Sequence, residues 1–378
     1  MTRRQLGLAA AATAALSPAG KAFQSGGLPD HVDHQANMTD LDPVRWTLEQ
    51  YQSAPLRLTF RATDKAAAEA WQGQLRTKLV ELLGGFPERT ALHPQTLEIR
   101  DFPRYRREKF AFESRPGLDV LGYLLTPSGG PAPHAPMICI PGHGRGVDDI
   151  VGIDENGNNR TDKPGYQHDF AIQVVEHGMA AVAIEPMGFG YRRDAITRKH
   201  GPTASACQPS AGSALLLGQT MVGWRVWDVM RAIDWVQTRP ELDAKRIGCL
   251  GISGGGTCTQ FAAALDTRIK AAFVSGYLNT FRDSIMSVSH CIDNYVPGIL
   301  NWAENYDVAS LIAPRFFFSE GGDRDPIFPL GTTRESFAKV KRAYEVFGVP
   351  DRAQQEIFAG EHSFHGVKGL AFLAASLG

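Results

Sequence analysis

The chain has 378 residues, of which 43% are hydrophobic and 21% charged, and its formal net charge is −1 at pH 7. This length suffices for a large buried core, and the near-neutral charge gives no electrostatic reason to expect nucleic acid or an anionic membrane surface as a partner. The cysteines number five, which is odd and too few for a disulfide scaffold. Cys139 and Cys249 fall in apolar runs and are expected to be core thiols, whereas Cys207 and Cys291 fall in loop-like segments and are candidates for a disulfide in an oxidising compartment.

Residues 1–22 have the pattern of an export signal. Arg3 and Arg4 precede an alanine-rich apolar run to Leu16, and small residues then lead to Ala22. The paired arginines indicate the twin-arginine route, and the apolar run is too short to span a bilayer. An amphipathic N-terminal tail is the alternative, but the pattern favours export to the periplasm or the extracellular space.

Residues 23–95 are predicted to form an N-terminal extension with one amphipathic helix. Asp64 is a suitable N-cap for this helix, which carries apolar residues at helical spacing and ends at Gly84. Residues 96–112 and 120–125 then have the composition of two strands joined by a proline-glycine turn. They predict an antiparallel hairpin at the start of the main domain.

Short apolar strands alternate with helices from residue 136 onward. The predicted strands are residues 137–140, 180–185, 246–250, 270–274, 314–319 and 355–358. The predicted helices are residues 170–177, 219–238, 254–265, 332–347 and 367–377, and residues 191–212 are expected to form a polar loop. Continuously apolar strands that alternate with helices are typical of a parallel sheet covered on both faces. We therefore predict an α/β fold, with a mostly parallel sheet and an antiparallel opening hairpin, as one domain over residues 96–378.

Gly251-Ile252-Ser253-Gly254-Gly255 matches G-x-S-x-G between a strand and a helix. A strand that turns directly into a helix strains its corner residue, and glycine two positions before and after the corner avoids a collision. The corner lifts the Ser253 hydroxyl out of the sheet and places the Gly254 N–H at the positive end of the helix. A glycine-rich loop without catalytic function would match the same sequence pattern. A nucleotide-binding turn is a second alternative, but no G-x-G-x-x-G or lysine-bearing phosphate loop is present. The pattern favours a nucleophilic serine.

An acidic turn and a histidine follow the last two predicted strands. Residues 320–329 contain Asp323 and Asp325 after the penultimate strand, and His362 follows the last one. The carboxyl ends of parallel strands meet at one edge of a sheet, so these groups are expected near Ser253. A serine hydroxyl needs a base to take its proton and an acid to orient that base. The chain order Ser, Asp, His predicts this arrangement.

From about residue 60 to its end, the chain resembles α/β-hydrolases of the dienelactone-hydrolase and acetyl-xylan-esterase kind. The matching segments are residues 243–248, 251–255, 322–329 and 360–362. The resemblance implies the α/β-hydrolase fold and a serine-dependent carboxylic ester hydrolase that acts through an acyl-enzyme, without a cofactor. It also suggests acetylated or otherwise esterified carbohydrate as substrate.

The resemblance implies specific residues for the triad. The family's acid stands in a G-x-x-D-x-x-x-P turn, which here selects Asp325, with Asp323 as the alternative. The histidine directly after the last strand is His362, whereas His365 is expected to be a neighbour or an exposed loop residue. His362-x-x-His365, preceded by Glu361, lacks the helical H-E-x-x-H arrangement of a zinc site, so no metal is expected there.

The oxyanion hole requires two backbone N–H groups. One is expected from Gly254 and the other from the loop after residue 140. The family usually has His-Gly-x or His-Asp-x there, whereas this chain has Pro141-Gly142-His143. This departure leaves His143 as the predicted donor, with Gly144 or Arg145 as alternatives.

The segment 277–313 is long for a connection between neighbouring strands and is rich in aromatic residues. Because it leaves a carboxyl strand end, we expect it to form a small cap over Ser253, with Tyr295 and Trp302 lining the substrate pocket. The alternative is that these aromatic side chains only pack the segment onto the helices beneath.

Two further functions remain open from the sequence. One is a peptidase or amidase of prolyl-oligopeptidase ancestry, although no N-terminal propeller of repeats is present. The other is a non-catalytic binding protein with a hydrolase fold, which the intact serine, acid and histidine disfavour.

Overall fold

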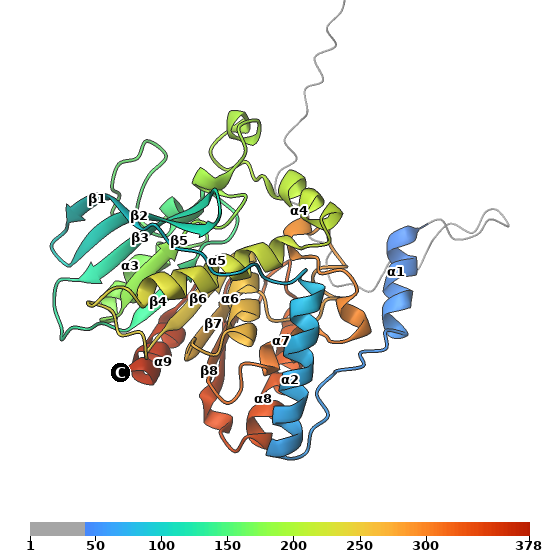
Figure 1. Cartoon of the computed structure of the whole chain (residues 1–378). Helices are drawn as coiled ribbons and strands as arrows, with labels where there is room; N and C mark the ends of the chain where they lie inside the picture. The colour runs from blue at the N-terminus through green and yellow to red at the C-terminus, as the bar shows by residue number, and fades with distance from the viewer. Residues whose placement is uncertain (1–41) are drawn as a thin grey trace, which may run out of the picture.

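A nine-stranded sheet with the order β1-β2-β3-β5-β4-β6-β7-β8-β9 runs through the computed structural model, which describes residues 42–378 (Figure 1). The pairs β1/β2, β2/β3 and β3/β5 are antiparallel, and every pair from β5/β4 to β8/β9 is parallel. The strands are β1 (Gln95–Asp101), β2 (Tyr105–Arg115), β3 (Leu118–Pro127), β4 (Pro136–Ile140), β5 (Ala180–Ile184), β6 (Gly248–Ile252), β7 (Ala271–Ser275), β8 (Phe316–Gly322) and β9 (Ala353–Phe358). The predicted fold class is confirmed.

Helices cover both faces of this sheet. The helices of the described chain are α1 (Pro43–Gln52), which stands apart from the sheet in Figure 1, and α2 (Lys65–Leu82), α3 (Phe170–Glu176), α4 (Cys207–Leu216), α5 (Met221–Val236), α6 (Gly254–Leu265), α7 (Asn305–Ser310), α8 (Leu330–Val346) and α9 (Val367–Leu377). None of the helices within residues 42–378 is long and apolar enough to cross a membrane.

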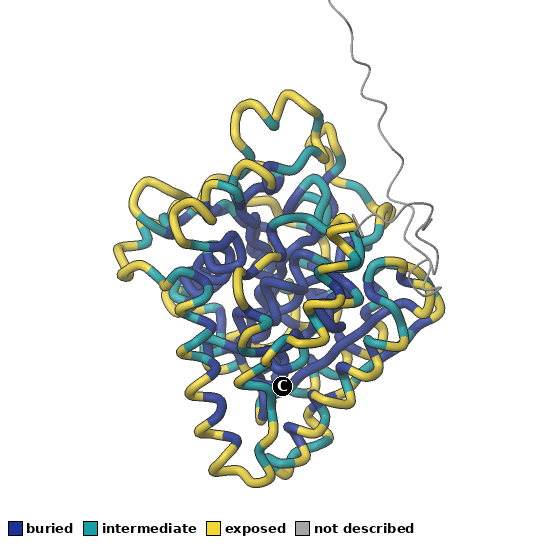
Figure 2. The backbone as a smooth tube through the Cα atoms, turned by 90° about the vertical axis from the view of Figure 1, so that its right-hand side faces the viewer, coloured by how far each residue is buried: buried dark blue, intermediate teal, exposed yellow. Residues whose placement is uncertain are grey.

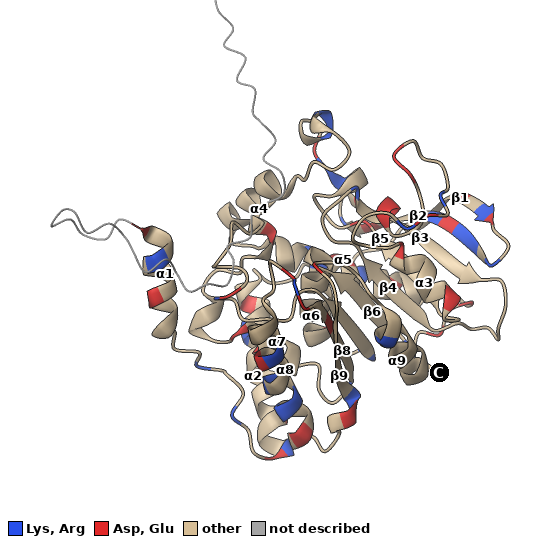
Figure 3. Ribbon diagram, turned by 180° about the vertical axis from the view of Figure 1, so that it is seen from behind, with Lys and Arg blue, Asp and Glu red and all other residues tan. Residues whose placement is uncertain are grey.

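Alternate side chains of each central strand enter two separate apolar layers. On β4, Ile138 and Ile140 join a cluster with residues of α2, α5, α6, α7 and α8, whereas Met137 and Cys139 join a cluster with residues of α3 and α9. This alternation follows from the two-residue period of a strand. The strands β4 to β7 are therefore buried throughout, as the dark core of Figure 2 shows. In Figure 3, the charged residues lie mostly on the helices and loops around these strands and on the edge strands.

The predicted strand over residues 96–112 is interrupted in the structure. β1 ends at Asp101, and the Phe102 N–H donates to the Tyr105 carbonyl at 2.8 Å across a tight turn before β2 begins. Pro103 lies in this turn, where its missing N–H and fixed φ are tolerated. The opening hairpin is β2–β3, as predicted, and β1 adds a further antiparallel strand at the edge.

The prediction of a loop over residues 191–212 is wrong in its last part. Helix α4 begins at Cys207, because the run of alanine, serine and leucine that follows is compatible with a helix. Pro209 stands in its first turn, where the N–H has no intrahelical partner to lose.

The N-terminal extension packs on the same core as the main domain. Helix α2 begins after the predicted cap Asp64, and its Trp71, Leu75 and Leu79 are buried in the cluster that includes α5 and α6; it lies beside α7 and α8 in Figures 1 and 3. The predicted export signal, residues 1–22, lies outside the described residues. The division at residue 95 stays a prediction.

Candidate active site

Ser253 occupies the corner between β6 and α6 in a strained backbone conformation, with φ 56° and ψ −120°. A Cβ added at Gly251 would lie 2.3 Å from the Gly255 carbonyl oxygen, and one at Gly255 would lie 2.0 Å from the Ile140 carbonyl oxygen. Only glycine therefore fits at both positions. The Ser253 N–H donates to the Ser275 carbonyl at 3.0 Å, which ties the corner to the end of β7. The local geometry is that of a nucleophile elbow.

His362 and Asp325 form a hydrogen-bonded pair. The Nδ1 atom of His362 lies 2.7 Å from Asp325 Oδ2, and the other carboxylate oxygen accepts the N–H groups of Ile327 at 2.8 Å and Phe328 at 3.1 Å. Asp325 is buried. Since its oxygens are held by three donors, the carboxylate is fixed in the position that orients the imidazole.

The two alternatives, Asp323 and His365, point elsewhere. Asp323 accepts the Gly360 N–H at 2.9 Å and pairs with Arg324 at the surface. The His365 ring stacks on Phe358 with centroids 4.7 Å apart, and its Nδ1 lies 3.6 Å from Glu356. The structure thus brings His362 together with Asp325 and not with Asp323.

Backbone contacts place this pair close to the serine. A Cβ added at Gly276, which directly follows Ser275, would lie 2.9 Å from His362 Cε1 and 3.8 Å from Asp325 Oδ2. The Nε2 atom of His362 is buried and has no hydrogen-bond partner among residues 42–378. That nitrogen is available to accept a proton.

Two aromatic rings flank the imidazole. The rings of Tyr166 and Phe328 each lie 5.6 Å from the His362 ring at an interplanar angle of 25°. The Tyr166 hydroxyl also donates to the His143 carbonyl at 2.8 Å, and burial raises the pKa of Tyr166, so it remains a neutral donor. The sequence carries no motif for Tyr166, because it lies in an irregular segment before α3.

The loop after β4 leaves two adjacent backbone N–H groups free. Gly142 donates to Gln167 Oε1 at 2.8 Å, and Arg145 donates to Asp149 Oδ2 at 2.7 Å. Within the described chain, the N–H groups of His143, Gly144 and Gly254 have no hydrogen-bond acceptor. A Cβ at Gly142 would lie 3.2 Å from Ser253 Cβ, which places this loop beside the elbow. The N–H of Arg145 is already used, so it is unsuited to an oxyanion hole.

The Glu185 carboxylate fixes the end of this loop by accepting hydrogen bonds from backbone N–H groups. Its carboxylate is fully buried at the end of β5 and accepts the N–H groups of Val147 at 3.1 Å and Tyr191 at 3.2 Å. Burial raises the pKa of Glu185 to about 8. A Cβ at Gly146 or Gly190 would lie 2.1 Å from this carboxylate, so both loops require glycine there. Glu185 directly follows a buried strand, which is visible in the sequence, but it belongs to no motif.

A compact group of nitrogen, sulfur and oxygen atoms lies on the other side of His143. The donor cluster consists of His143, Cys207, Cys291 and Asp293, whose ligand-type atoms all lie within 4.8 Å of one another. Both cysteines are free thiols, so the disulfide considered for them is not formed in the structure. A Cβ at Gly254 would lie 3.4 Å from the His143 ring and 3.9 Å from Asp293 Oδ2, so the cluster adjoins the elbow.

A second cluster of possible metal ligands consists of Glu320, Glu356 and His365. Its side chains make structural contacts. Glu320 accepts from the Ser275 hydroxyl at 2.8 Å and from the backbone N–H groups of His365 and Gly366 at 3.0 and 2.9 Å. These bonds join β7, β8 and the turn before α9. The absence of a metal at His362 and His365 stays a prediction.

The two aromatic residues predicted for the substrate pocket have other contacts. Trp302 lies between the charged groups of Arg57 and Lys78, which are 5.2 and 4.2 Å from its ring centroid. Tyr295 is exposed, and its hydroxyl donates to the Ile285 carbonyl at 3.0 Å. None of these contacts involves the elbow or His362, and the role of both residues in substrate binding stays a prediction.

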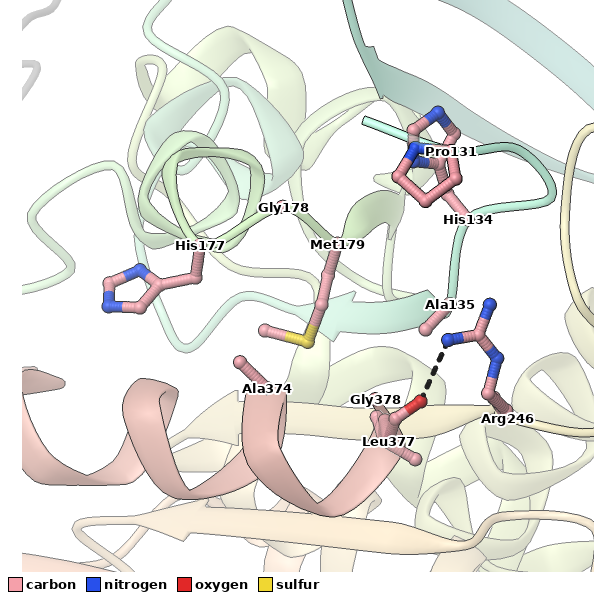
Figure 4. Close-up of a pocket in the computed structure, with 10 residues that line it drawn as sticks. All are labelled: Pro131, His134, Ala135, His177, Gly178, Met179, Arg246, Ala374, Leu377 and Gly378. Carbon is pink, nitrogen blue, oxygen red and sulfur yellow. Dashed lines mark hydrogen bonds between the residues drawn. The ribbon is translucent and has the colours of Figure 1, made fainter. Parts of the chain in front are cut away.

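A pocket of about 180 Å³ lies at the opposite edge of the sheet (Figure 4). It is lined by His134 and Ala135 before β4, Met179 before β5, and Arg246 before β6; Arg246 donates to the Leu377 carbonyl at 3.0 Å. In open α/β sheets, ligands bind outside the carboxyl ends of the strands. This pocket, at the amino ends, is therefore separate from the site at Ser253.

Comparisons with known proteins agree with this geometry. The model of the Abhydrolase family matches residues 47–363. YtaP of Bacillus subtilis (strain 168), named as a candidate hydrolase, is 26% identical over 267 residues, which are 68% of this chain and 83% of YtaP. These matches confirm the resemblance predicted from the motifs, at the level of the family.

Solved structures show the same fold. A candidate acetyl xylan esterase of Bacteroides fragilis NCTC 9343 has a TM-score of 0.72 at 22% identity, covering 85% of this chain and 83% of that one. A glucuronoyl esterase of Solibacter usitatus has a TM-score of 0.63 at 15% identity, covering 86% of this chain and 97% of that one.

Proposed function

Because the chain belongs to the Abhydrolase family, we propose that it is an exported serine esterase that cleaves carboxylic esters through an acyl-enzyme. The observation that carries the proposal is the convergence of three groups at one edge of the sheet. They are the strained Ser253, the His362–Asp325 pair with a free Nε2, and the free N–H groups of the loop after β4 and of Gly254.

In the proposed reaction, the Ser253 hydroxyl attacks the ester carbonyl while His362 Nε2 takes its proton. Asp325 stabilises the imidazolium that forms, and the N–H groups of His143 and Gly254 donate to the oxyanion. The imidazolium then protonates the departing alcohol, which leaves an ester between Ser253 and the acyl group. Water, activated by His362, hydrolyses this ester and releases the carboxylic acid. Apart from water and the substrate, every group that takes part in this reaction belongs to the chain.

Esterified carbohydrate is the substrate class that we propose. The structures similar to this chain include proteins named as acetyl xylan and glucuronoyl esterases, and the export pattern of residues 1–22 would bring the enzyme to the compartment where such polymers occur. The fold alone does not select a substrate, since loops above the sheet do so.

The test is an ester panel on the purified protein and on Ser253→Ala. The wild type should hydrolyse short-chain nitrophenyl esters and react with a fluorophosphonate probe, and the variant should do neither, with an unchanged circular dichroism spectrum. Undiminished turnover by Ser253→Ala would refute the mechanism. A clear preference for aminoacyl amides over acetyl esters would instead assign the same site to an amidase.

Acetylated xylan and methyl esters of uronic acids, compared as substrates, would test the carbohydrate assignment. We expect release of acetate or methanol from at least one of these classes at a higher kcat/KM than from nitrophenyl acetate. Cleavage of simple aryl esters alone would leave a serine esterase and reject the carbohydrate class. Fractionation into culture supernatant, periplasm and cytoplasm, compared with the double variant Arg3→Lys and Arg4→Lys, would test export separately.

A further inference from the structure

The donor cluster has the composition and spacing of a metal site. The His143 Nε2 atom lies 3.7 Å from Cys207 Sγ and 3.5 Å from Asp293 Oδ2, and the last two atoms are 3.2 Å apart. Four tetrahedral ligands at zinc-ligand bond lengths lie about 3.3–3.8 Å from one another. The measured separations fall in or next to this range, and Cys291 Sγ completes the group within 4.8 Å of the other three atoms.

We propose that the donor cluster binds a thiophilic divalent cation such as Zn²⁺ in a structural site beside the oxyanion hole. One nitrogen, two sulfurs and one carboxylate oxygen are ligands that zinc takes readily, and four protein ligands leave no open position for a bound water. The site is separate from the proposed ester chemistry, because His143 would bind through its side chain and serve the oxyanion through its backbone N–H.

The four ligands come from three separate segments of the chain. His143 lies in the loop after β4, Cys207 begins α4, and Cys291 and Asp293 lie at the short helix Ile292–Asn294 in the insertion. Cys207 and Asp293 are almost completely buried. A metal ion here would join the oxyanion loop, α4 and the insertion at one point, so its binding is expected to stabilise the region around Ser253.

Arg225 places a positive charge next to the donor cluster. Its guanidinium lies 2.5 Å from Asp293 Oδ2 and donates to Cys207 Sγ at 3.4 Å, so a fixed positive charge lies against two of the proposed ligand atoms. With two thiolates, one carboxylate and neutral imidazole, a zinc ion leaves one negative charge, which Arg225 balances. The other Asp293 oxygen accepts from Asn294 Nδ2 at 2.8 Å. Ligating carboxylates are usually held by such outer hydrogen bonds.

A disulfide between Cys207 and Cys291 is the competing use of the two sulfurs. It would explain why the thiols are close, but it gives no reason for the imidazole and carboxylate to converge on them at these distances. Zinc binding accounts for all four side chains. It releases the two thiol protons to solvent and needs no oxidant.

The experiment measures metal binding by the reduced, full-length chain. After treatment with a phosphine reductant and a chelator, the wild type is dialysed against micromolar ZnCl₂, and its zinc content is determined by mass spectrometry. We expect about one zinc per chain and a raised melting temperature. In Cys207→Ala and Cys291→Ala we expect binding at least about 100-fold weaker, and in Arg225→Gln about 10- to 100-fold weaker.

Cys139→Ala and His365→Gln are the matched controls, since they remove a thiol and an imidazole outside the donor cluster, and should bind zinc as the wild type does. Co²⁺ added to the wild type should give the visible absorption of a tetrahedral site with sulfur ligands, a readout that needs no variant to fold. Absence of zinc binding by the reduced wild type, or zinc retained by both cysteine variants, would overturn the proposal. A Cys207–Cys291 disulfide in the purified protein, with no zinc bound after its reduction, would also overturn it.

Discussion

Asp323 and Asp325 are separated by a single residue, yet their hydrogen-bond partners give them different surroundings. The turn after β8 places the N–H groups of Ile327 and Phe328 on one oxygen of Asp325 and leaves the other for His362. Asp323 instead closes the neighbouring loop through Gly360. The same chemical group thus orients an imidazole at one position and holds a backbone turn at the other.

We predict that Asp325→Asn lowers kcat for a nitrophenyl ester by about 10³- to 10⁴-fold, because an amide neither fixes the imidazole tautomer nor stabilises its cation. Asp323→Asn keeps an oxygen for the Gly360 N–H and should change kcat less than about 5-fold. Steady-state kinetics on both variants checks this. Equal losses at the two positions would reject the assignment of Asp325 to His362.

Tyr166 is predicted to act as a positioning residue. Tyr166→Phe retains the ring stacked on His362 and removes only the hydrogen bond to the His143 carbonyl, so about 1 kcal/mol of loop ordering is lost. We expect kcat to fall about 5- to 10-fold, with KM and melting temperature nearly unchanged. Loss of stability with normal kcat would instead indicate a purely structural role.

At the level of elements, the N-terminal segment and the insertion form one unit. The N–H groups of residues 56–58 donate to carbonyls of residues 300–302, and Phe60 donates to Asp307 at 2.9 Å. The buried carboxylate of Glu304 accepts from the Tyr51 hydroxyl at 3.0 Å and from the Phe281 N–H at 2.7 Å. Residues 51–60 of the N-terminal segment therefore hold residues 300–307 of the insertion in place. Residues 291–294 of the insertion lie on the side of the elbow.

The packing of the insertion against the N-terminal segment changes the effect that we expect when the Trp302 side chain is truncated. Trp302→Ala removes two cation–π contacts of about 0.5–1 kcal/mol each. We expect a lower melting temperature, by about 2–4 °C, and an unchanged ranking across the ester panel. Tyr295→Ala, at an exposed position, is the comparison. A shifted ranking without loss of stability would support the prediction that Trp302 lines the substrate pocket.

At the level of the whole molecule, burial raises the pKa of four carboxyl groups well above the ordinary range. Burial raises the pKa of Glu185 to about 8, of Glu304 and Glu320 to about 7, and of Asp307 to about 6. In the unfolded chain each group ionises near its ordinary value, close to pH 4. The folded protein therefore binds more protons between about pH 5 and 8. The stability that these four groups contribute is lost as the pH rises through this range.

This linkage predicts a falling melting temperature from pH 5 to pH 8, measured by calorimetry. Glu185→Gln, which resembles the protonated acid, should show a shallower fall, because its contribution no longer titrates. Asp148, close to Glu185, adds a negative charge that raises the same pKa, so Asp148→Asn should reduce the slope as well. Parallel curves for Glu185→Gln and the wild type would contradict the raised pKa.

The sequence by itself determined the elements whose signals are local. Strand and helix periodicity, the cap at Asp64 and the glycines around Ser253 act over a few residues, so the sheet, the elbow and the position of His362 after the last strand could be predicted. The family pattern added the choice of Asp325. The interruption near Pro103 and the start of α4 were missed because several conformations suit those residues, and neighbouring elements select one.

Only the tertiary structure decided which distant side chains meet. Tyr166, Phe328 and Glu185 carry no motif, and Trp302 was placed by contacts with Arg57 and Lys78 rather than by its position in the insertion. The residues of the donor cluster come from three separate segments, so no spacing motif in the sequence predicts the cluster. The physical reason is that a hydrogen bond, an ion pair or a metal ligand depends on distance in space. The packing of the whole sheet and its helices sets that distance.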